Sequence, residues 1–218
     1  MVIRHAEKPG TYNGQDYWGV DPTGNACGAD GHNHLVTLGW ERTGGLVSLF
    51  TAPWKPQILS TPDFLYAANP TREDPSHRPY ETLTALASKL RLDINKSYSS
   101  DQYETMVGDA LKTPGVVLIC WQHEDIPLER IKEPEPPRPG ISTWILKKTG
   151  THSTKGVPRT WPKTPTGKDR YDLVFVFSRR TGKGPIDTFT VLPQFLLAGD
   201  LAWPQDSPLW AWVNCAHA

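Results

Sequence analysis

The apolar run GVVLICWQH, at residues 115–123, is the feature that most constrains how this chain can fold. Both faces of the run would be apolar in an extended conformation, which is typical of a central strand in a parallel sheet covered on both faces. Segments with helical spacing alternate with shorter extended runs before it: helices at 37–50, 78–92 and 99–113, and extended pieces at 1–3, 56–60 and 92–98. This alternation predicts an α/β domain with a mostly parallel sheet.

Two further apolar runs, at 171–178 and 186–193, are separated by the segment RRTGKGP and predict a β-hairpin. The proline-rich segment at 132–140 is expected to be extended and exposed. The chain has no internal repeat, and its 218 residues suit a single domain over 1–218. The expected architecture is a three-layer sandwich in which helices cover both faces of the sheet.

Charge and composition argue against several classes of partner. The chain has 23 basic and 23 acidic residues and no basic cluster, so neither nucleic acid nor an anionic membrane is an expected partner. Its longest apolar stretches have the length of a strand, far below the roughly 20 residues of a spanning helix. No basic segment followed by an apolar core begins the sequence, and the three cysteines are scattered. We therefore expect a cytoplasmic protein without a disulfide framework.

Two of the expected strands end in histidine. The first run, VIRH, delivers Arg4 and His5 together, and the central run ends at His123. Because ligands bind outside the carboxyl ends of parallel strands, both histidines are expected at one edge of the sheet. Arg78 opens an expected helix near that edge, and a helix N-terminus attracts anions. These four residues predict a cationic pocket for phosphoryl groups, which guanidinium groups bind bidentately.

The segments RHAEKP, HRPYETL and WQHEDIP, taken in this order, resemble the histidine phosphatase superfamily, also called the phosphoglycerate mutase-like family. That family is marked by an Arg-His pair after the first strand, a later arginine that opens a helix, and a second histidine after a central strand. The segment LVTLGWERTGGLVSLF resembles the family's first helix, and the YDLVFVF strand suits its closing sheet. The resemblance covers most of residues 1–125 and implies a phosphoglycerate mutase-like fold.

The resemblance also implies a role for each matching residue. His5 is the implied nucleophile, which would form a phosphohistidine. Arg4, Arg78 and His123 are the implied groups that hold the phosphate.

The implied proton donor is less clearly marked. Glu124 stands where one branch of the family carries an acidic proton donor. Glu7 is a rival for that role, or a substrate contact, because the segment HAEKP also puts it near the nucleophile. The chain departs from the family at Ala6, where glycine is usual, and in the length of two loops.

Those two loops, at 6–34 and 63–77, are expected to leave the carboxyl edge of the sheet and pass over the cleft. They carry five aromatic residues: Tyr12, Tyr17, Trp18, Phe64 and Tyr66. We expect them to form a wall or lid against the organic part of a substrate, with Tyr17 and Trp18 as binding residues. The alternative is that the loops pack on the outer helices.

The segment CGADGHNH offers Cys27, Asp30, His32 and His34 as metal ligands, but their spacing matches no tight zinc pattern. We therefore expect no metal site, and the resemblance implies no cofactor. Cys120 lies inside the apolar central run and is expected to be a thiol packed in the core.

These observations favour a metal-independent phosphomonoester hydrolase that acts on a small phosphorylated or anionic molecule through a phosphohistidine. One alternative keeps the pocket but uses it for phosphoryl transfer, as a mutase does, or for a non-phosphatase biosynthetic reaction on a bulky organic substrate. Another is a catalytically silent module that binds a phosphorylated ligand, against which the complete set of arginines and histidines argues. The sequence leaves the oligomeric state open.

Overall fold

The computed structural model describes residues 1–12, 15–25, 29–198 and 200. Within these residues the chain forms a six-stranded central sheet in the order β10-β9-β1-β6-β4-β5. The strands are β1 (Val2–Arg4), β4 (Phe64–Ala67), β5 (Ile94–Asn95), β6 (Val117–Trp121), β9 (Leu173–Ser178) and β10 (Thr188–Pro193). Strands β1, β6, β4 and β5 are parallel, and β9 is antiparallel to both of its neighbours. The predicted α/β class, with a mostly parallel sheet, is confirmed.

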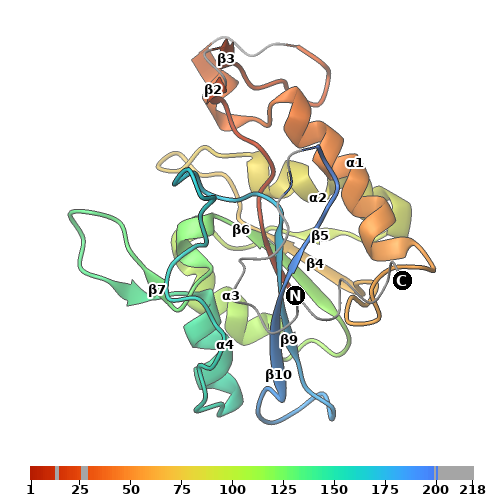
Figure 1. The fold of residues 1–218 in the computed structure, drawn as a ribbon, viewed down its shortest axis with the longest axis vertical. Coiled ribbons are helices and arrows are strands. Elements are labelled where there is room, and N and C mark those ends of the chain that lie inside the picture. The colour runs from red at the N-terminus through yellow and green to blue at the C-terminus, as the bar shows by residue number, and fades with distance from the viewer. Residues whose placement is uncertain (13–14, 26–28, 199, 201–218) are drawn as a thin grey trace.

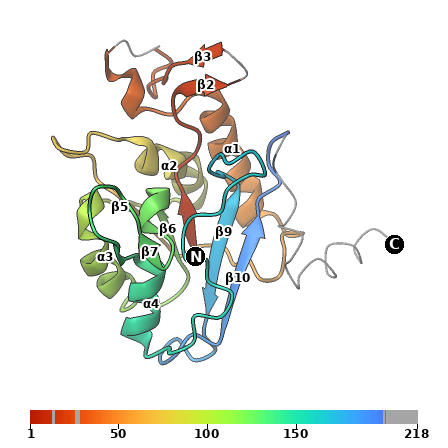
Figure 2. The same cartoon turned by 60° about the vertical axis from the view of Figure 1, so that its left-hand side comes forward.

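Helices cover both faces of the sheet (Figures 1 and 2). Helices α1 (Thr37–Thr51) and α2 (Arg78–Leu90) cover one face, and α3 (Tyr103–Ala110) and α4 (Ile141–Thr149) cover the other. Strand β6 serves both cores, as its apolar run predicted: Leu118 and Cys120 pack toward α1 and α2, and Ile119 and Trp121 toward α3 and α4. Cys120 is fully buried, in agreement with its expected place in the core.

The second parallel strand differs from the sequence-based expectation. Residues 56–60 form a turn, in which the Leu59 amide donates to the carbonyl of Pro56, and the strand is β4 instead. Strand β4 contains no proline, so each of its residues keeps a backbone N–H for pairing. The segment that was expected to pair begins with Pro56, which has no backbone N–H. Phe64 and Tyr66 therefore belong to the sheet and not to a loop above the cleft, so their expected place in a lid is wrong.

Helix α4 was not expected from the sequence. It starts directly after the proline-rich segment, with Gly140 before its first turn, and ends at Gly150, whose φ of 72° is the left-handed conformation that glycine adopts easily. Ile141 and Ile145 face the core. The helix expected at 99–113 is shorter than predicted: it begins as a 3₁₀ turn, Ser100–Gln102, and continues as α3.

The remaining short elements lie outside the central sheet. Strands β2 (Gly10–Tyr12) and β3 (Gln15–Tyr17) form a hairpin, which stands above the carboxyl edge of β1 in Figure 1. A 3₁₀ turn, Ala29–Asn33, precedes α1. Strands β7 (Glu129–Arg130) and β8 (Arg138–Pro139) pair at either end of the proline-rich segment. Among the described residues, no helix has the length and apolar character needed to cross a membrane.

Candidate active site

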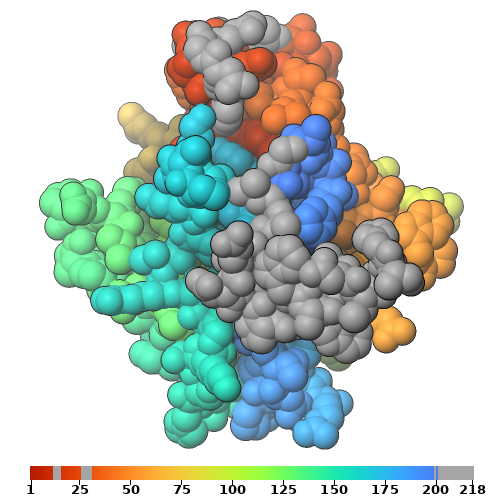
Figure 3. Space-filling view, in the orientation of Figure 1, coloured from red at the N-terminus to blue at the C-terminus, as the bar shows by residue number. Residues whose placement is uncertain are grey.

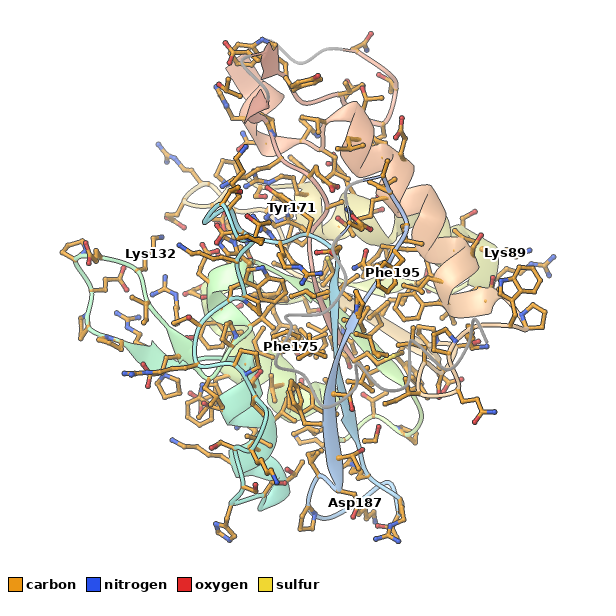
Figure 4. All side chains as sticks on the ribbon, in the orientation of Figure 1. Lys89, Lys132, Tyr171, Phe175, Asp187 and Phe195 are labelled. Carbon is orange, nitrogen blue, oxygen red and sulfur yellow. The ribbon has the colours of Figure 1, made fainter. Side chains whose placement is uncertain are left out.

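The carboxyl ends of β1 and β6 bring Arg4, His5 and His123 to the same edge of the sheet. In the parallel pairing of these strands Arg4 lies opposite Trp121, and the His5 amide donates to the Trp121 carbonyl at 3.1 Å. His123 begins a 3₁₀ turn, His123–Asp125, two residues after β6 ends. Because β9 is antiparallel to β1, its start reaches this edge as well. Figure 4 shows Tyr171 at that end of β9, on the side of the β2–β3 hairpin, with Asp187 at the opposite end of the sheet.

The ring of His5 is held in one orientation by its own backbone. Its Nδ1 lies 2.7 Å from the carbonyl oxygen of Ala6. A carbonyl only accepts hydrogen bonds, so Nδ1 carries the proton and Nε2 carries the lone pair. Burial first, then the charges of Arg78 and Arg4, lower the pKa of His5 well below 6.5. The ring is therefore neutral near neutral pH and has a nucleophilic Nε2.

Two arginines place positive charge beside this ring. Arg4, 1% exposed, lies with its guanidinium carbon 3.7 Å from the ring centroid of Tyr171, and its Nη1 donates to the carbonyl of Arg170 at 3.1 Å. Arg78 is the first residue of α2, and its Nε donates to the Ser76 hydroxyl at 2.9 Å. Burial and the nearby charge of Arg4 both act to lower the pKa of Arg78, as expected for like charges gathered around one point.

His123 lies between two carboxylates. Its Nδ1 is 2.9 Å from Oε2 of Glu124, and its Nε2 is 3.0 Å from Oδ2 of Asp169. Burial alone would raise the pKa of the Glu124 carboxyl. The hydrogen bond and charge of His123, together with the charge of Arg4, outweigh burial and lower it to about 2. Glu124 is therefore ionised at neutral pH while it lies against His123.

Glu7, the other carboxyl considered from the sequence, belongs to a different network. Its Oε1 accepts from Arg42 Nη2 at 2.7 Å and from Nε at 3.0 Å, and its Oε2 accepts from Nε at 3.1 Å. Arg42 also pairs with Asp200 at 2.7 Å, and both Glu7 and Arg42 are buried. Glu7 thus fastens the segment after β1 to helix α1, and both of its oxygens are engaged by one guanidinium.

A cavity of about 450 Å³ adjoins the arginine and histidine cluster. The segment after β1 and the loop before β9 line it from opposite sides, and Figure 3 shows cyan residues of the latter directly beneath the red and orange N-terminal segment. Its charged and aromatic lining includes Arg4, Lys8, Asp169 and Tyr171, and Leu38 and Leu197 add apolar surface. A larger cavity of about 880 Å³ lies at the opposite edge of the sheet, beside Met1 and Phe177, so size alone does not identify the site.

Three residues at this edge were missed by sequence reasoning: Lys8, Asp169 and Tyr171. Burial, followed by the charges of Arg4 and Arg78, lowers the pKa of Lys8, which places this ammonium in the same cationic cluster. The start of the YDLVFVF strand could have indicated the other two, because an antiparallel neighbour of β1 must begin where β1 ends.

The aromatic residues expected to contact a substrate do not line this cavity. Tyr17 and Trp18 are 42% and 53% exposed, and the Trp18 ring meets the His32 ring edge-on at 5.2 Å. The side chain of Tyr12 lies outside the described residues.

The metal ligands considered from the sequence are only partly described. Cys27 and the side chain of Asp30 fall outside the described residues. His34 pairs with the buried carboxylate of Glu81 and stacks on the His77 ring at 4.8 Å. Within the part of the chain that the structure describes, no three histidine, cysteine or acidic side chains are grouped so that they could hold a metal ion.

Comparison with known proteins adds no identification. No family model matches the sequence, and no curated protein matches it significantly.

Proposed function

We propose that the protein is a phosphomonoester hydrolase that acts through a phosphohistidine on His5. The observation that carries the proposal is the state of the His5 ring. Its Nδ1–H is held by the Ala6 carbonyl at 2.7 Å, and Nε2 is left as the nucleophilic nitrogen near the buried Arg4 and the half-buried Arg78. A neutral imidazole beside two guanidinium groups is suited to attack a dianionic phosphate, whose charge the arginines stabilise.

In the proposed reaction, Arg4, Arg78 and His123 hold the oxygens of the phosphoryl group. Lys8 adds positive charge on the side of the cavity. Nε2 of His5 attacks phosphorus in line while the bond to the leaving oxygen breaks. The arginines stabilise the charge on the equatorial oxygens, and most of the rate increase would come from positioning and electrostatics.

The second half of the reaction is hydrolysis of the phosphohistidine. Water attacks phosphorus, the Nε2–P bond breaks, and inorganic phosphate leaves while a carboxylate accepts the proton of the water. A carboxyl group must therefore donate a proton in the first step and accept one in the second. Glu124, the donor implied by the sequence, is one candidate beside His123, and Asp169 is another.

The proposal is tested by assaying the purified protein against a panel of phosphorylated metabolites and p-nitrophenyl phosphate, beside two alanine variants. His5→Ala should lose turnover by about a thousandfold or more, because it removes the group that forms the covalent bond. His152→Ala, at an exposed histidine after α4, is the matched control and should keep wild-type activity. Turnover that survives His5→Ala would refute the proposal, and so would phosphate binding by the wild type without hydrolysis of any ester.

A further inference from the structure

We propose that Asp169 is the proton donor to the leaving oxygen and the base that later activates water. This assignment rests on the proposed function and names a residue that sequence reasoning did not consider. It follows from a comparison of three carboxyl groups near the cluster of arginines and histidines: Glu7, Glu124 and Asp169.

Two of those carboxyl groups are engaged in ways that oppose proton donation. Glu7 gives both oxygens to the guanidinium of Arg42 in a buried pair, so a proton on it would break that pair. Glu124 lies against Nδ1 of His123 and is ionised at neutral pH, since its pKa is about 2. A proton donor must carry a proton before the reaction, and neither carboxyl meets that condition in this arrangement.

Asp169 combines two features that the other two carboxyl groups have only singly: it lines the cavity, as Glu7 does, and it contacts His123, as Glu124 does. Its side chain is about one third exposed and lines the 450 Å³ cavity together with Arg4, Lys8 and Tyr171. Its carboxylate lies 3.0 Å from Nε2 of His123. Asp169 therefore occupies the position on His123 that a phosphate oxygen would take in the proposed reaction.

Backbone contacts on both sides of Asp169 fix its position in the loop before β9. Asp169 pairs with Lys163 in a β-bridge, and the amide of Arg170 donates to the Pro162 carbonyl at 3.3 Å. Trp161 donates to the Arg170 carbonyl at 2.7 Å, and the Arg170 side chain pairs with Asp172 in the buried core of the loop. These contacts hold Asp169 at the wall of the cavity, within reach of a substrate.

In the proposed reaction the substrate replaces Asp169 on His123, and the Asp169 carboxyl carries the proton that the leaving oxygen needs. When a phosphate oxygen accepts the Nε2–H of His123, it takes the place of the Asp169 carboxyl there, and that carboxyl can turn toward the leaving oxygen. As His5 Nε2 bonds to phosphorus, the bond from phosphorus to the leaving oxygen breaks, and the Asp169 proton passes to that oxygen. The resulting carboxylate then takes a proton from the attacking water as the Nε2–P bond breaks.

The test compares leaving groups in four proteins: the wild type, Asp169→Asn, Glu124→Gln and the exposed control Asp93→Asn. A donor matters for an alkyl phosphate, whose alkoxide is a poor leaving group, and little for p-nitrophenyl phosphate, whose phenolate leaves without a proton. Asp169→Asn should lower kcat/KM by about 10²–10⁴-fold for the alkyl phosphate and by less than about tenfold for p-nitrophenyl phosphate. Asp93→Asn should leave both values unchanged.

A second readout follows from the role of Asp169 as base. With p-nitrophenyl phosphate, Asp169→Asn should release a burst of p-nitrophenol and accumulate phosphohistidine, because cleavage proceeds while hydrolysis of the intermediate is slow. The burst also shows that the variant is folded. Asp169→Glu, which keeps a carboxylic acid, should recover part of the alkyl phosphate activity.

The outcomes separate this assignment from the proposed function. Equal losses on both esters in Asp169→Asn, or the leaving-group-dependent loss in Glu124→Gln instead, would overturn the assignment and leave phosphohistidine catalysis standing. A wild type that hydrolyses neither ester and forms no phosphohistidine would overturn both.

Discussion

The Nδ1 atom of His5 lies 2.7 Å from the carbonyl oxygen of Ala6, one residue along the chain. This contact is local, yet it decides the chemistry of the site, since the proton that it holds on Nδ1 leaves the lone pair on Nε2. A backbone carbonyl makes the bond, so the contact does not depend on the side chain of Ala6.

The first prediction concerns the pH dependence of stability. The folded protein keeps His5 neutral because burial, Arg78 and Arg4 lower its pKa well below 6.5, whereas the unfolded chain takes up a proton below pH 6.5. The unfolded state then binds more protons, so this residue makes stability fall as the pH drops below 6.5, by up to about 1.4 kcal/mol per pH unit. His5→Ala should lose less stability than the wild type between neutral and mildly acidic pH. Urea unfolding measures this, with His152→Ala as control, and identical profiles would contradict a buried neutral ring.

The second prediction concerns Glu7. Glu7→Gln leaves the buried guanidinium of Arg42 with one carboxylate fewer, and removing one partner of a buried pair typically costs about 3–5 kcal/mol. We expect a loss at the lower end of this range, because Asp200 still pairs with Arg42. Glu41→Gln, at an exposed position of the same helix, should change stability by less than about 0.5 kcal/mol. A stable Glu7→Gln variant with a loss only on alkyl phosphates would instead make Glu7 the proton donor.

The third prediction concerns anion binding by Arg78. Its guanidinium can hold two phosphate oxygens at once, which an ammonium cannot reproduce. Arg78→Lys should therefore weaken the binding of inorganic phosphate by about tenfold, and Arg78→Gln by more, in isothermal titration calorimetry. The exposed Arg72→Gln variant, in the loop before the same helix, should bind phosphate as the wild type does. Equal affinities in all four proteins would show that Arg78 does not contact the anion.

The fourth prediction concerns the exposed aromatic pair. Because Tyr17 and Trp18 do not line the cavity, replacing both by alanine should change kcat/KM by a similar, small factor for a large and a small phosphate ester. The β2–β3 hairpin is then a scaffold for the segment that carries Lys8 and not a selective lid. A much larger loss for the large ester would restore the substrate-binding role that the sequence suggested for these residues.

Much of the fold could be predicted because its signals are local. The apolar run around Cys120 and the two runs flanking residues 179–185 have the period and length of strands, and both predictions are confirmed. Helix α4 was missed because its nine residues follow a proline-rich segment. The second parallel strand was predicted at 56–60 but lies at 64–67. Both segments are short apolar runs, and only their pairing with β6, which local sequence does not show, distinguishes them.

The candidate site was predictable only where a residue sits at the end of a regular element. Four predicted residues hold such positions: Arg4, His5, Arg78 and His123. In the structure the charges of Arg4, Arg78 and His123 act on the His5 ring, and the charge of Arg4 acts on Arg78. The pairing of Glu7 with Arg42 could not be foreseen, because it joins residues 35 positions apart through the packing of α1. The contact of Asp169 with His123 depends likewise on how the loop before β9 folds over the sheet edge.

The central claim is the phosphohistidine, and trapping it tests that claim most directly. The wild type is mixed with a phosphate ester that it hydrolyses, quenched in base within milliseconds, and digested, and the modified residue is identified by mass spectrometry and ³¹P NMR. We predict an acid-labile, base-stable phosphoryl group on His5, attached at Nε2, because the Ala6 carbonyl holds the proton of Nδ1. A phosphoryl group on Nδ1 or on another residue, or hydrolysis without any trapped intermediate, would contradict the account.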